Sequence, residues 1–164
     1  MSVSPVFPVG GVEAHWITLD DDVMGGHSRS RVVVRDGVLR FSGATSLEDK
    51  GGFASIRARG AFDLADAAGL RLRVLGDGRE YQLRIATDAR HHGSHVSWRG
   101  DFATRVGEWH EVTVAFADMQ PTYRGTVLEG PALDLSKVEE IGVLIGDGRA
   151  GAFSLEVAWI ALLV

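Results

Sequence analysis

The feature that most constrains this chain is an alternation of apolar and polar residues in short segments, several of which are separated by Asp-Gly. Alternation with a period of two is typical of β-strands that bury one face and expose the other. An Asp-Gly pair between two such segments favours a type I′ hairpin turn, because both central residues of that turn need a positive φ. The sequence therefore predicts a chain made largely of short β-strands.

Three hairpins are expected from these turns: 31–35 with 38–41 around Asp36-Gly37, 70–75 with 81–85 around Asp77-Gly78, and 141–145 with 153–160 near Asp147-Gly148. The last two contain the same tetrapeptide, Gly-Asp-Gly-Arg, which fits either shared turn chemistry or an internal duplication. Further strands are predicted over 53–59, 95–102 and 109–116, and single helical turns over 63–68 and 133–138. About ten short strands with regular turns indicate an all-β fold, with a single β-sandwich or jelly roll spanning residues 1–164.

Composition excludes several classes of protein. The 164 residues contain no cysteine, which excludes a disulfide scaffold, thiolate metal ligands and thiol nucleophiles. A net charge of −5 argues against a nucleic-acid partner held by bulk electrostatics. The longest apolar run, 158–164, is far too short to span a membrane, and the N-terminal residues lack the pattern of a signal or transit peptide. We therefore expect a cytoplasmic protein without a transmembrane segment.

Arginines gather on one face of the predicted sheet. If the apolar residues of 70–75 and 81–85 face the core, Arg73 and Arg84 lie together on the opposite face, and Arg57 of another strand extends that face. Guanidinium groups on one sheet face repel each other unless acids or a ligand balance their charge. The sequence therefore predicts either internal ion pairs or an open ligand-binding groove at this face.

Three segments are richer in glycine and polar residues than hairpin turns require: 20–28, 46–55 and 121–125. Paired glycines allow close approach of the backbone to a ligand or to another strand, and both explanations fit these segments. The candidate binding residues in them are Asp21, Met24, Gly25, Gly26, Ser28, Gly51, Gly52, Phe53 and Arg124.

Metal and catalytic motifs find little support. The acidic run 20–22 does not have the ligand spacing of a calcium-binding EF-hand loop, which favours a solvated or capping role. His91, His92 and His95 are candidate ligands for zinc or nickel, but a solvent-exposed loop is the simpler explanation. The chain contains no nucleophile elbow and no phosphate-binding loop. We predict no metal site, no cofactor and no enzymatic activity.

Several motifs resemble the complex I intermediate-associated protein 30 family. They run in order along the chain: Trp16, Asp21-x-Val-Met-Gly-Gly-x-Ser28, Ser46-Leu-Glu, Gly51-Gly-Phe-Ala-Ser-Ile-Arg57, Leu70-Arg-Leu-Arg-Val, Gly76-Asp-Gly-Arg-x-Tyr81, Gly107-x-Trp109 and Pro121-Thr-x-Arg-Gly125. The resemblance implies a galactose-binding-like β-sandwich, akin to family 11 carbohydrate-binding modules, with a non-catalytic role. It also implies a function like that of the mitochondrial members, which are assembly factors that act as chaperones for intermediates of respiratory complex I.

The leading hypothesis is therefore a binding protein for a partner polypeptide, by analogy an assembly intermediate of complex I (NADH dehydrogenase). The loops around 21–28 and 51–57 would offer backbone N–H groups, and Arg73, Arg84 and Arg124 would bind carboxylates. One alternative is a glycan-binding module that uses the sheet face and an aromatic residue such as Trp98 or Tyr81, although Trp98 also fits a core position. The other is a metal-dependent enzyme built on the three histidines.

Overall fold

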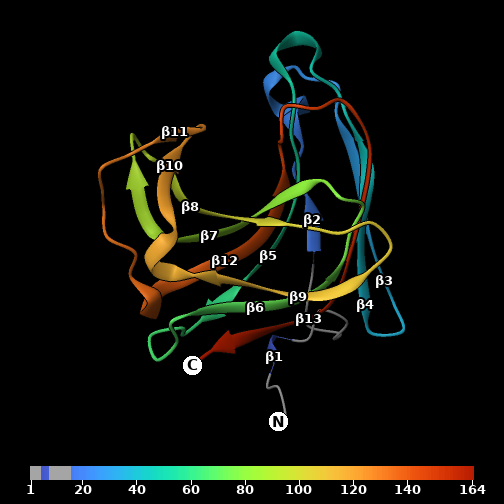
Figure 1. Ribbon diagram of the computed structural model, residues 1–164. Helices are drawn as coiled ribbons and strands as arrows, with labels where there is room; N and C mark the ends of the chain where they lie inside the picture. Colours follow the sequence, from blue (N-terminus) through green and yellow to red (C-terminus); the bar gives the residue numbers. More distant parts are fainter. Residues whose placement is uncertain (1–4, 8–15) are drawn as a thin grey trace.

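The computed structural model describes residues 5–7 and 16–164, with the side chains at 5–7, 23, 24 and 50 left out. The described chain forms two antiparallel β-sheets that pack face to face, as Figure 1 shows. The prediction of an all-β sandwich is confirmed. No helix in the described part of the chain is long and apolar enough to cross a membrane.

The first sheet has six strands, and β13 lies at its centre. Its order is β3 (Arg29–Arg35), β4 (Val38–Thr45), β13 (Gly151–Leu163), β6 (Gly69–Leu75) and β9 (Trp109–Ala115), and β1 (Pro5–Phe7) also pairs with β13. The second sheet has seven strands in the order β11 (Thr126–Val127), β10 (Gln120–Tyr123), β8 (Ser94–Ala103), β7 (Glu80–His91), β12 (Val138–Ile145), β5 (Ala54–Phe62) and β2 (Trp16–Thr18). Short 3-10 helices occur at η1 (Asp21–Met24), η2 (Glu48–Lys50), η3 (Phe116–Asp118) and η4 (Leu135–Lys137).

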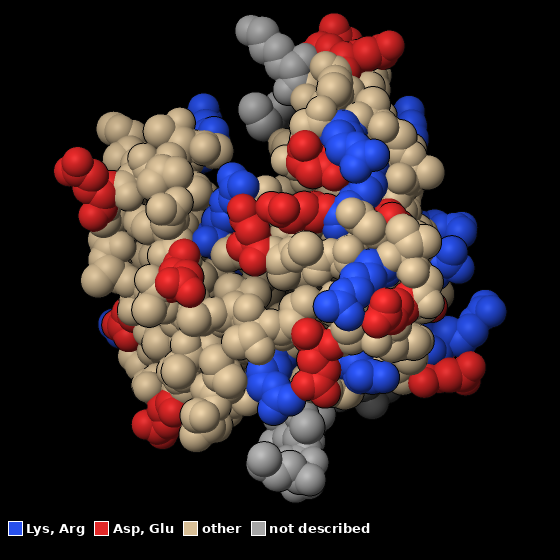
Figure 2. All heavy atoms as spheres, viewed as in Figure 1, with Lys and Arg blue, Asp and Glu red and all other residues tan. Residues whose placement is uncertain are grey.

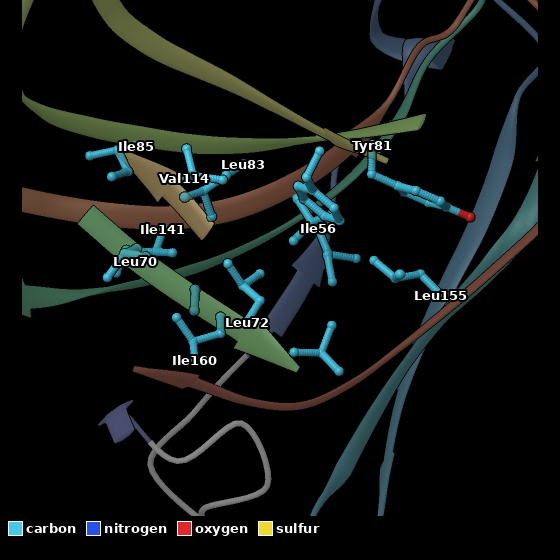
Figure 3. Close-up of a cluster of buried hydrophobic side chains, with 14 of the residues drawn as sticks. Ile56, Leu70, Leu72, Tyr81, Leu83, Ile85, Val114, Ile141, Leu155 and Ile160 are labelled. Carbon is cyan, nitrogen blue, oxygen red and sulfur yellow. The ribbon is translucent and has the colours of Figure 1, made fainter. Parts of the chain in front are cut away.

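The core lies between the two sheets and follows the predicted alternation. Leu70 and Leu72 of β6 face Leu83 of β7 and Ile141 of β12 across the sandwich, and all four side chains are fully buried (Figure 3). Because alternate residues of each strand enter this core, the residues between them point to the outer face of the same sheet. The core pattern therefore determines which side chains lie on the outer face of the seven-stranded sheet.

Only the first of the three predicted hairpins forms. In β3 and β4, Arg35 pairs with Val38, and Asp36 and Gly37 adopt the positive φ values of 53° and 77° that a type I′ turn requires. The prediction that 70–75 pairs with 81–85 is wrong, because β6 pairs with β13 and β9 whereas β7 pairs with β12 and β8. The pairing of 141–145 with 153–160 is also wrong, since β12 and β13 lie in different sheets.

The two Gly-Asp-Gly-Arg segments connect the sheets instead of turning within one. The first leads from β6 to β7 and the second from β12 to β13, and their side chains meet. Arg79 donates from Nε and Nη2 to the carboxylate of Asp147 at 2.9 and 2.6 Å, and from Nη1 to the carbonyl oxygen of Gly151 at 3.0 Å. This bidentate ion pair, here called the Arg79–Asp147 clasp, joins the two crossing segments at one end of the sandwich.

Helical structure is confined to short turns. The segment predicted over 133–138 contains η4, where the Asp134 carboxylate accepts a hydrogen bond from the Ser136 amide as an N-cap. No helix forms over 63–68, where the Asp63 carboxylate instead accepts from the Ala65 amide within a turn. A hairpin without an Asp-Gly signal joins β7 to β8, with His92 and Gly93 at φ 49° and 78°.

Candidate functional site

The outer face of the seven-stranded sheet holds a groove with a volume of about 680 Å³. Figure 2 shows the surface hollowed in the upper part of the molecule, between the side that carries β10 and β11 and the opposite side. The groove is lined from strands β5, β7, β8, β10 and β12 and from the loops beside them. It is the candidate binding site.

Alternation in the strands decides which side chains reach the groove. In β7, Tyr81, Leu83 and Ile85 are buried in the core, so the alternate residues Gln82 and Arg84 face outward and line the groove. The same rule places Ser97 and Arg99 of β8, and Ser55 and Arg57 of β5, on the groove side. The predicted outward position of Arg57 and Arg84 is confirmed.

Strand register aligns three arginines across the sheet. Arg99 of β8 is opposite Arg84 of β7, Arg84 is opposite Gly142 of β12, and Gly142 is opposite Arg57 of β5. We call Arg57, Arg84 and Arg99 the arginine row. Like charges on neighbouring strands destabilise a sheet unless they are compensated.

Two members of the row have acidic partners. Arg57 Nη1 lies 3.2 Å from Oε1 of the buried Glu140, and Arg99 Nε and Nη2 donate to the two carboxylate oxygens of Asp101 at 2.8 and 3.1 Å. These hydrogen bonds to Asp101 raise the pKa of Arg99. At these two positions the positive charge is compensated within the protein.

Arg84 differs because neutral groups hold it. Its Nε and Nη2 donate to Oε1 of Gln82 at 3.0 and 2.6 Å, and its Nη1 donates to the hydroxyls of Ser97 at 3.2 Å and Thr122 at 3.0 Å. No carboxylate among the described residues forms an ion pair with it. Burial lowers the pKa of Arg84 to about 10, and the charges of the other two arginines in the row add to this lowering.

Apolar side chains form another part of the groove lining. They are Leu19, Leu47, Phe53 and Leu144, from the loops around β2 and β5 and from β12. Leu47 is 47% exposed, so part of this apolar wall faces solvent at the rim of the groove. The groove thus combines a cationic row with an apolar wall.

The loop 21–28 and the segment 51–53 contact each other through Asp21. The buried carboxylate of Asp21 accepts hydrogen bonds from the amide and hydroxyl of Ser28 at 2.8 and 2.5 Å, and from the amides of Gly52 and Phe53 at 2.6 and 3.2 Å. Burial raises the pKa of Asp21, but these hydrogen bonds outweigh it and the net shift is downward. We call this arrangement the Asp21 clasp.

The paired glycines serve that clasp. A Cβ atom at Gly26 would lie 2.5 Å from Cγ of Asp21, and one at Gly51 would lie 2.7 Å from its Oδ2. Gly25 has φ 87° where it ends η1. At Gly26 and Gly51 the missing side chain makes room for the Asp21 carboxylate, and Gly51, Gly52 and Phe53 also line the groove.

The other predicted residues lie in different places. Tyr81 and Trp98 are 0% and 2% exposed in the core, so neither can stack on a sugar ring. Arg73 lies on the outer face of the six-stranded sheet, 5.8 Å from the Trp109 ring centroid, and the expectation that it shares a face with Arg84 is wrong because β6 and β7 belong to different sheets. Arg124 lines the groove, and the side chain of Met24 lies outside the described part.

The histidines are separated by the β7–β8 hairpin. His91 and His92 pack against Tyr123, with ring centroids 4.8 and 5.9 Å from it, whereas His95 lines the groove. Across the residues that the structure describes, no group of three or more metal-ligating side chains is placed to hold a metal ion.

Sequence reasoning missed several groove residues, above all Arg99, Ser97, Thr122 and Glu140. Arg99 carried a usable signal, since Val96, Trp98 and Phe102 are inward at even positions of a predicted strand. Thr122 lies in the segment 121–125 noted in the sequence, but only the strand order places β10 beside β8. Glu140 carried no signal, because only the strand order places β12 beside β5.

Residues 9–157 match the sequence model of the family described as complex I intermediate-associated protein 30. The chain belongs to this family. Its sequence is 28% identical over 169 residues to the mitochondrial complex I intermediate-associated protein 30 of Mus musculus, covering 90% of this chain and 51% of the mouse protein. This member of the complex I intermediate-associated protein 30 family therefore spans about half the length of that relative.

Two solved structures with the same fold are carbohydrate-binding modules. The family 11 module of the cellulase Lic26A-Cel5E from Clostridium thermocellum superposes with a TM-score of 0.69 at 14% identity, covering 96% of this chain and 95% of the module. The Clostridium thermocellum family 11 module in complex with a β-1,3-1,4-mixed-linked tetrasaccharide gives a TM-score of 0.62 at 14% identity, covering 94% and 93%. At this identity the likeness shows that the complex I intermediate-associated protein 30 family member has the fold of these modules, as the sequence predicted.

Proposed function

We propose that this chain is a non-catalytic binding protein that assists the assembly of a respiratory NADH dehydrogenase by holding a segment of a partner polypeptide. The binding site is the groove of the seven-stranded sheet. The observation that carries the proposal is an open groove of about 680 Å³ in which Arg84 has no carboxylate partner among the described residues. Membership of the complex I intermediate-associated protein 30 family supports the assembly role.

A polypeptide fits the groove lining better than a neutral glycan does. Phe53 is the one Phe, Tyr or Trp side chain among the described lining residues, and the two aromatics predicted to contact a sugar are buried. Stacking of aromatic rings on sugar is thus restricted to one position, whereas guanidinium groups suit the carboxylates of a protein. Glycan binding remains the alternative, because a fold neighbour was solved with a bound tetrasaccharide.

The proposal also includes the predictions about domain organisation, cofactors, catalysis and cellular location. Two sheets around one core over residues 16–164 support the single domain predicted for 1–164. The proposal involves no cofactor and no catalytic step. The cytoplasmic location expected from the sequence stays a prediction, and the curated relative is mitochondrial by name.

The assembly role is tested by deleting the gene and separating NADH dehydrogenase intermediates on native gels. We expect fully assembled enzyme to fall and a subcomplex to accumulate. Normal assembly in the deletion strain, together with no subunit recovered on the tagged wild-type protein, would refute the proposal.

The groove is tested in the same cells by the substitution Leu47→Ser at its exposed rim. This variant should recover less of the partner subunit, because a 47% exposed leucine contributes to apolar contact with a ligand. The matched control is Val106→Ser, which changes a 78% exposed residue outside the groove lining and should recover the partner normally.

A further inference from the structure

The arginine row leaves one positive charge without a counter-ion. Its three guanidinium groups face two carboxylates, those of Glu140 and Asp101, each within ion-pair distance of one arginine. Arg84, at the middle of the row, is the member without one in the described part of the chain. The row therefore favours an anionic group such as a carboxylate, and Arg124, which also lines the groove, adds to this preference.

Arg84 is also held in a fixed position with a donor to spare. A guanidinium group has five N–H donors, and the contacts of Arg84 with Gln82, Ser97 and Thr122 use four of them. The donor that remains is one N–H of Nη2. Because neutral acceptors on β7, β8 and β10 orient the group, a ligand does not have to order this side chain on binding.

The groove lining beside the arginine row indicates which chemical group of a ligand would lie next to its negative charge. Gln82 lies two residues before Arg84 in β7, and it is opposite Leu144, which lies two residues after Gly142 in β12. Two residues of an extended strand span about 6.6–6.8 Å, so an apolar group lies roughly that far from the row. Leu47 and Phe53 continue the apolar wall from the neighbouring loops.

We infer that Arg84 is the centre of a carboxylate-binding subsite that takes a Glu or Asp side chain of the partner polypeptide, with an apolar residue two positions away on the apolar wall. The carboxylate accepts a hydrogen bond from Nη2 of Arg84, and the positive charges of Arg57 and Arg99 favour it. This inference rests on the proposed function and adds the kind of sequence that the groove selects.

A synthetic peptide tests the subsite without any change to the protein. The probe is the octapeptide Gly-Ser-Gly-Glu-Ser-Leu-Ser-Gly, acetylated and amidated so that its ends carry no charge. We expect binding to the full chain by NMR titration, with shifts at the amides of Arg84, Ser97 and Thr122. Replacing the peptide's Glu by Gln should weaken binding at least tenfold, replacing its Leu by Ser should weaken it severalfold, and added salt should weaken the Glu peptide alone.

Protein variants provide the second arm. Arg84→Gln should abolish the difference between the Glu and Gln peptides, while Arg73→Gln, on the outer face of the other sheet, should preserve it. Equal binding of the Glu and Gln peptides to the wild type, or no binding of either, overturns the inference. Binding of a glucuronate-containing oligosaccharide without binding of the Glu peptide also overturns it and assigns the groove to an acidic glycan.

The two proposals can fail separately. If deletion impairs NADH dehydrogenase assembly and the Leu47→Ser variant loses its partner, but Arg84→Gln binds that partner normally, the carboxylate subsite is wrong and the proposed function stands. If the Glu peptide binds through Arg84 but assembly is normal in the deletion strain, the subsite stands and the assembly role is wrong.

Discussion

At the scale of single residues, Asp21 joins two loops that are remote in sequence. Its carboxylate accepts hydrogen bonds from Ser28 on one side and from the amides of Gly52 and Phe53 on the other. Much of the motif Asp21-x-Val-Met-Gly-Gly-x-Ser28 therefore has a structural explanation, since Asp21, Gly26 and Ser28 all serve the Asp21 clasp.

Replacing Asp21 by Asn should lower the free energy of unfolding by about 2–3 kcal/mol, because an amide group cannot accept hydrogen bonds at the nitrogen that replaces one carboxylate oxygen. Urea unfolding at pH 7 measures the change. Asp22→Asn is the control: its side chain is exposed, and we expect a change within about 0.5 kcal/mol. Equal effects of the two substitutions would show that the Asp21 clasp does not stabilise the fold.

A substitution at Trp98 tests whether this residue stabilises the core or contacts a ligand. It is 2% exposed, so Trp98→Ala should destabilise the fold by about 3–5 kcal/mol through the cavity that it leaves. Thermal unfolding followed by circular dichroism tests this. A variant that unfolds at the wild-type temperature but has lost affinity for a glycan would contradict the burial and favour the carbohydrate alternative.

The arginines show how far single positions can be predicted. Alternation was sufficient to place Arg57 and Arg84 on an outer face, because the apolar neighbours of each residue determine which way it points. It could not place Arg73 correctly, since the same alternation holds in both sheets and does not say to which sheet a strand belongs. Direction is local information, whereas sheet membership depends on contacts between distant strands.

At the scale of elements, the Asp-Gly turns behave in two ways. Asp36-Gly37 closes a two-residue hairpin, whereas the loops containing Asp77-Gly78 and Asp147-Gly148 pass from one sheet to the other. The strands were predictable because each has its own apolar pattern. The crossings were not, because the Arg79–Asp147 clasp that joins them forms between segments 68 residues apart.

The Arg79–Asp147 clasp should contribute much more to the free energy of unfolding than a surface ion pair does. Arg79 is 7% exposed, and Arg79→Met leaves the Asp147 carboxylate largely buried without its cation, so we expect a loss of about 3–5 kcal/mol in urea unfolding. Arg105→Met breaks the exposed pair with Glu108 and should change stability by less than about 1 kcal/mol. Similar small effects at both sites would exclude a major role for the clasp.

At the scale of the whole molecule, the two clasps predict how stability depends on pH. The hydrogen bond from Arg79 lowers the pKa of Asp147 despite burial, and the net pKa shift of Asp21 is also downward. The folded protein thus binds these protons more weakly than the unfolded chain, in which an aspartate has a pKa of about 3.9. The stabilisation is complete above that pH and is lost as the pH falls through the lower folded-state pKa values.

Urea midpoints measured between pH 7 and pH 2 test this behaviour. We expect the wild type to lose stability steeply below about pH 4. Asp147→Asn should be less stable at pH 7 and should show a shallower decline in acid, because one of the responsible carboxylates is gone. Parallel pH profiles for the two proteins would mean that Asp147 does not titrate with a lowered pKa.

The arrangement of the groove has a consequence for how such a protein can diversify. In β5, β7 and β8 alternate residues pack in the core, and several of the residues between them, such as Arg57, Arg84 and Arg99, line the groove. Exchanging Ser97 or Arg99 of β8 would alter the groove lining and leave the apolar side chains of the core in place. A β-sandwich of this kind can therefore acquire new binding specificities through single substitutions in the groove that leave its core folded.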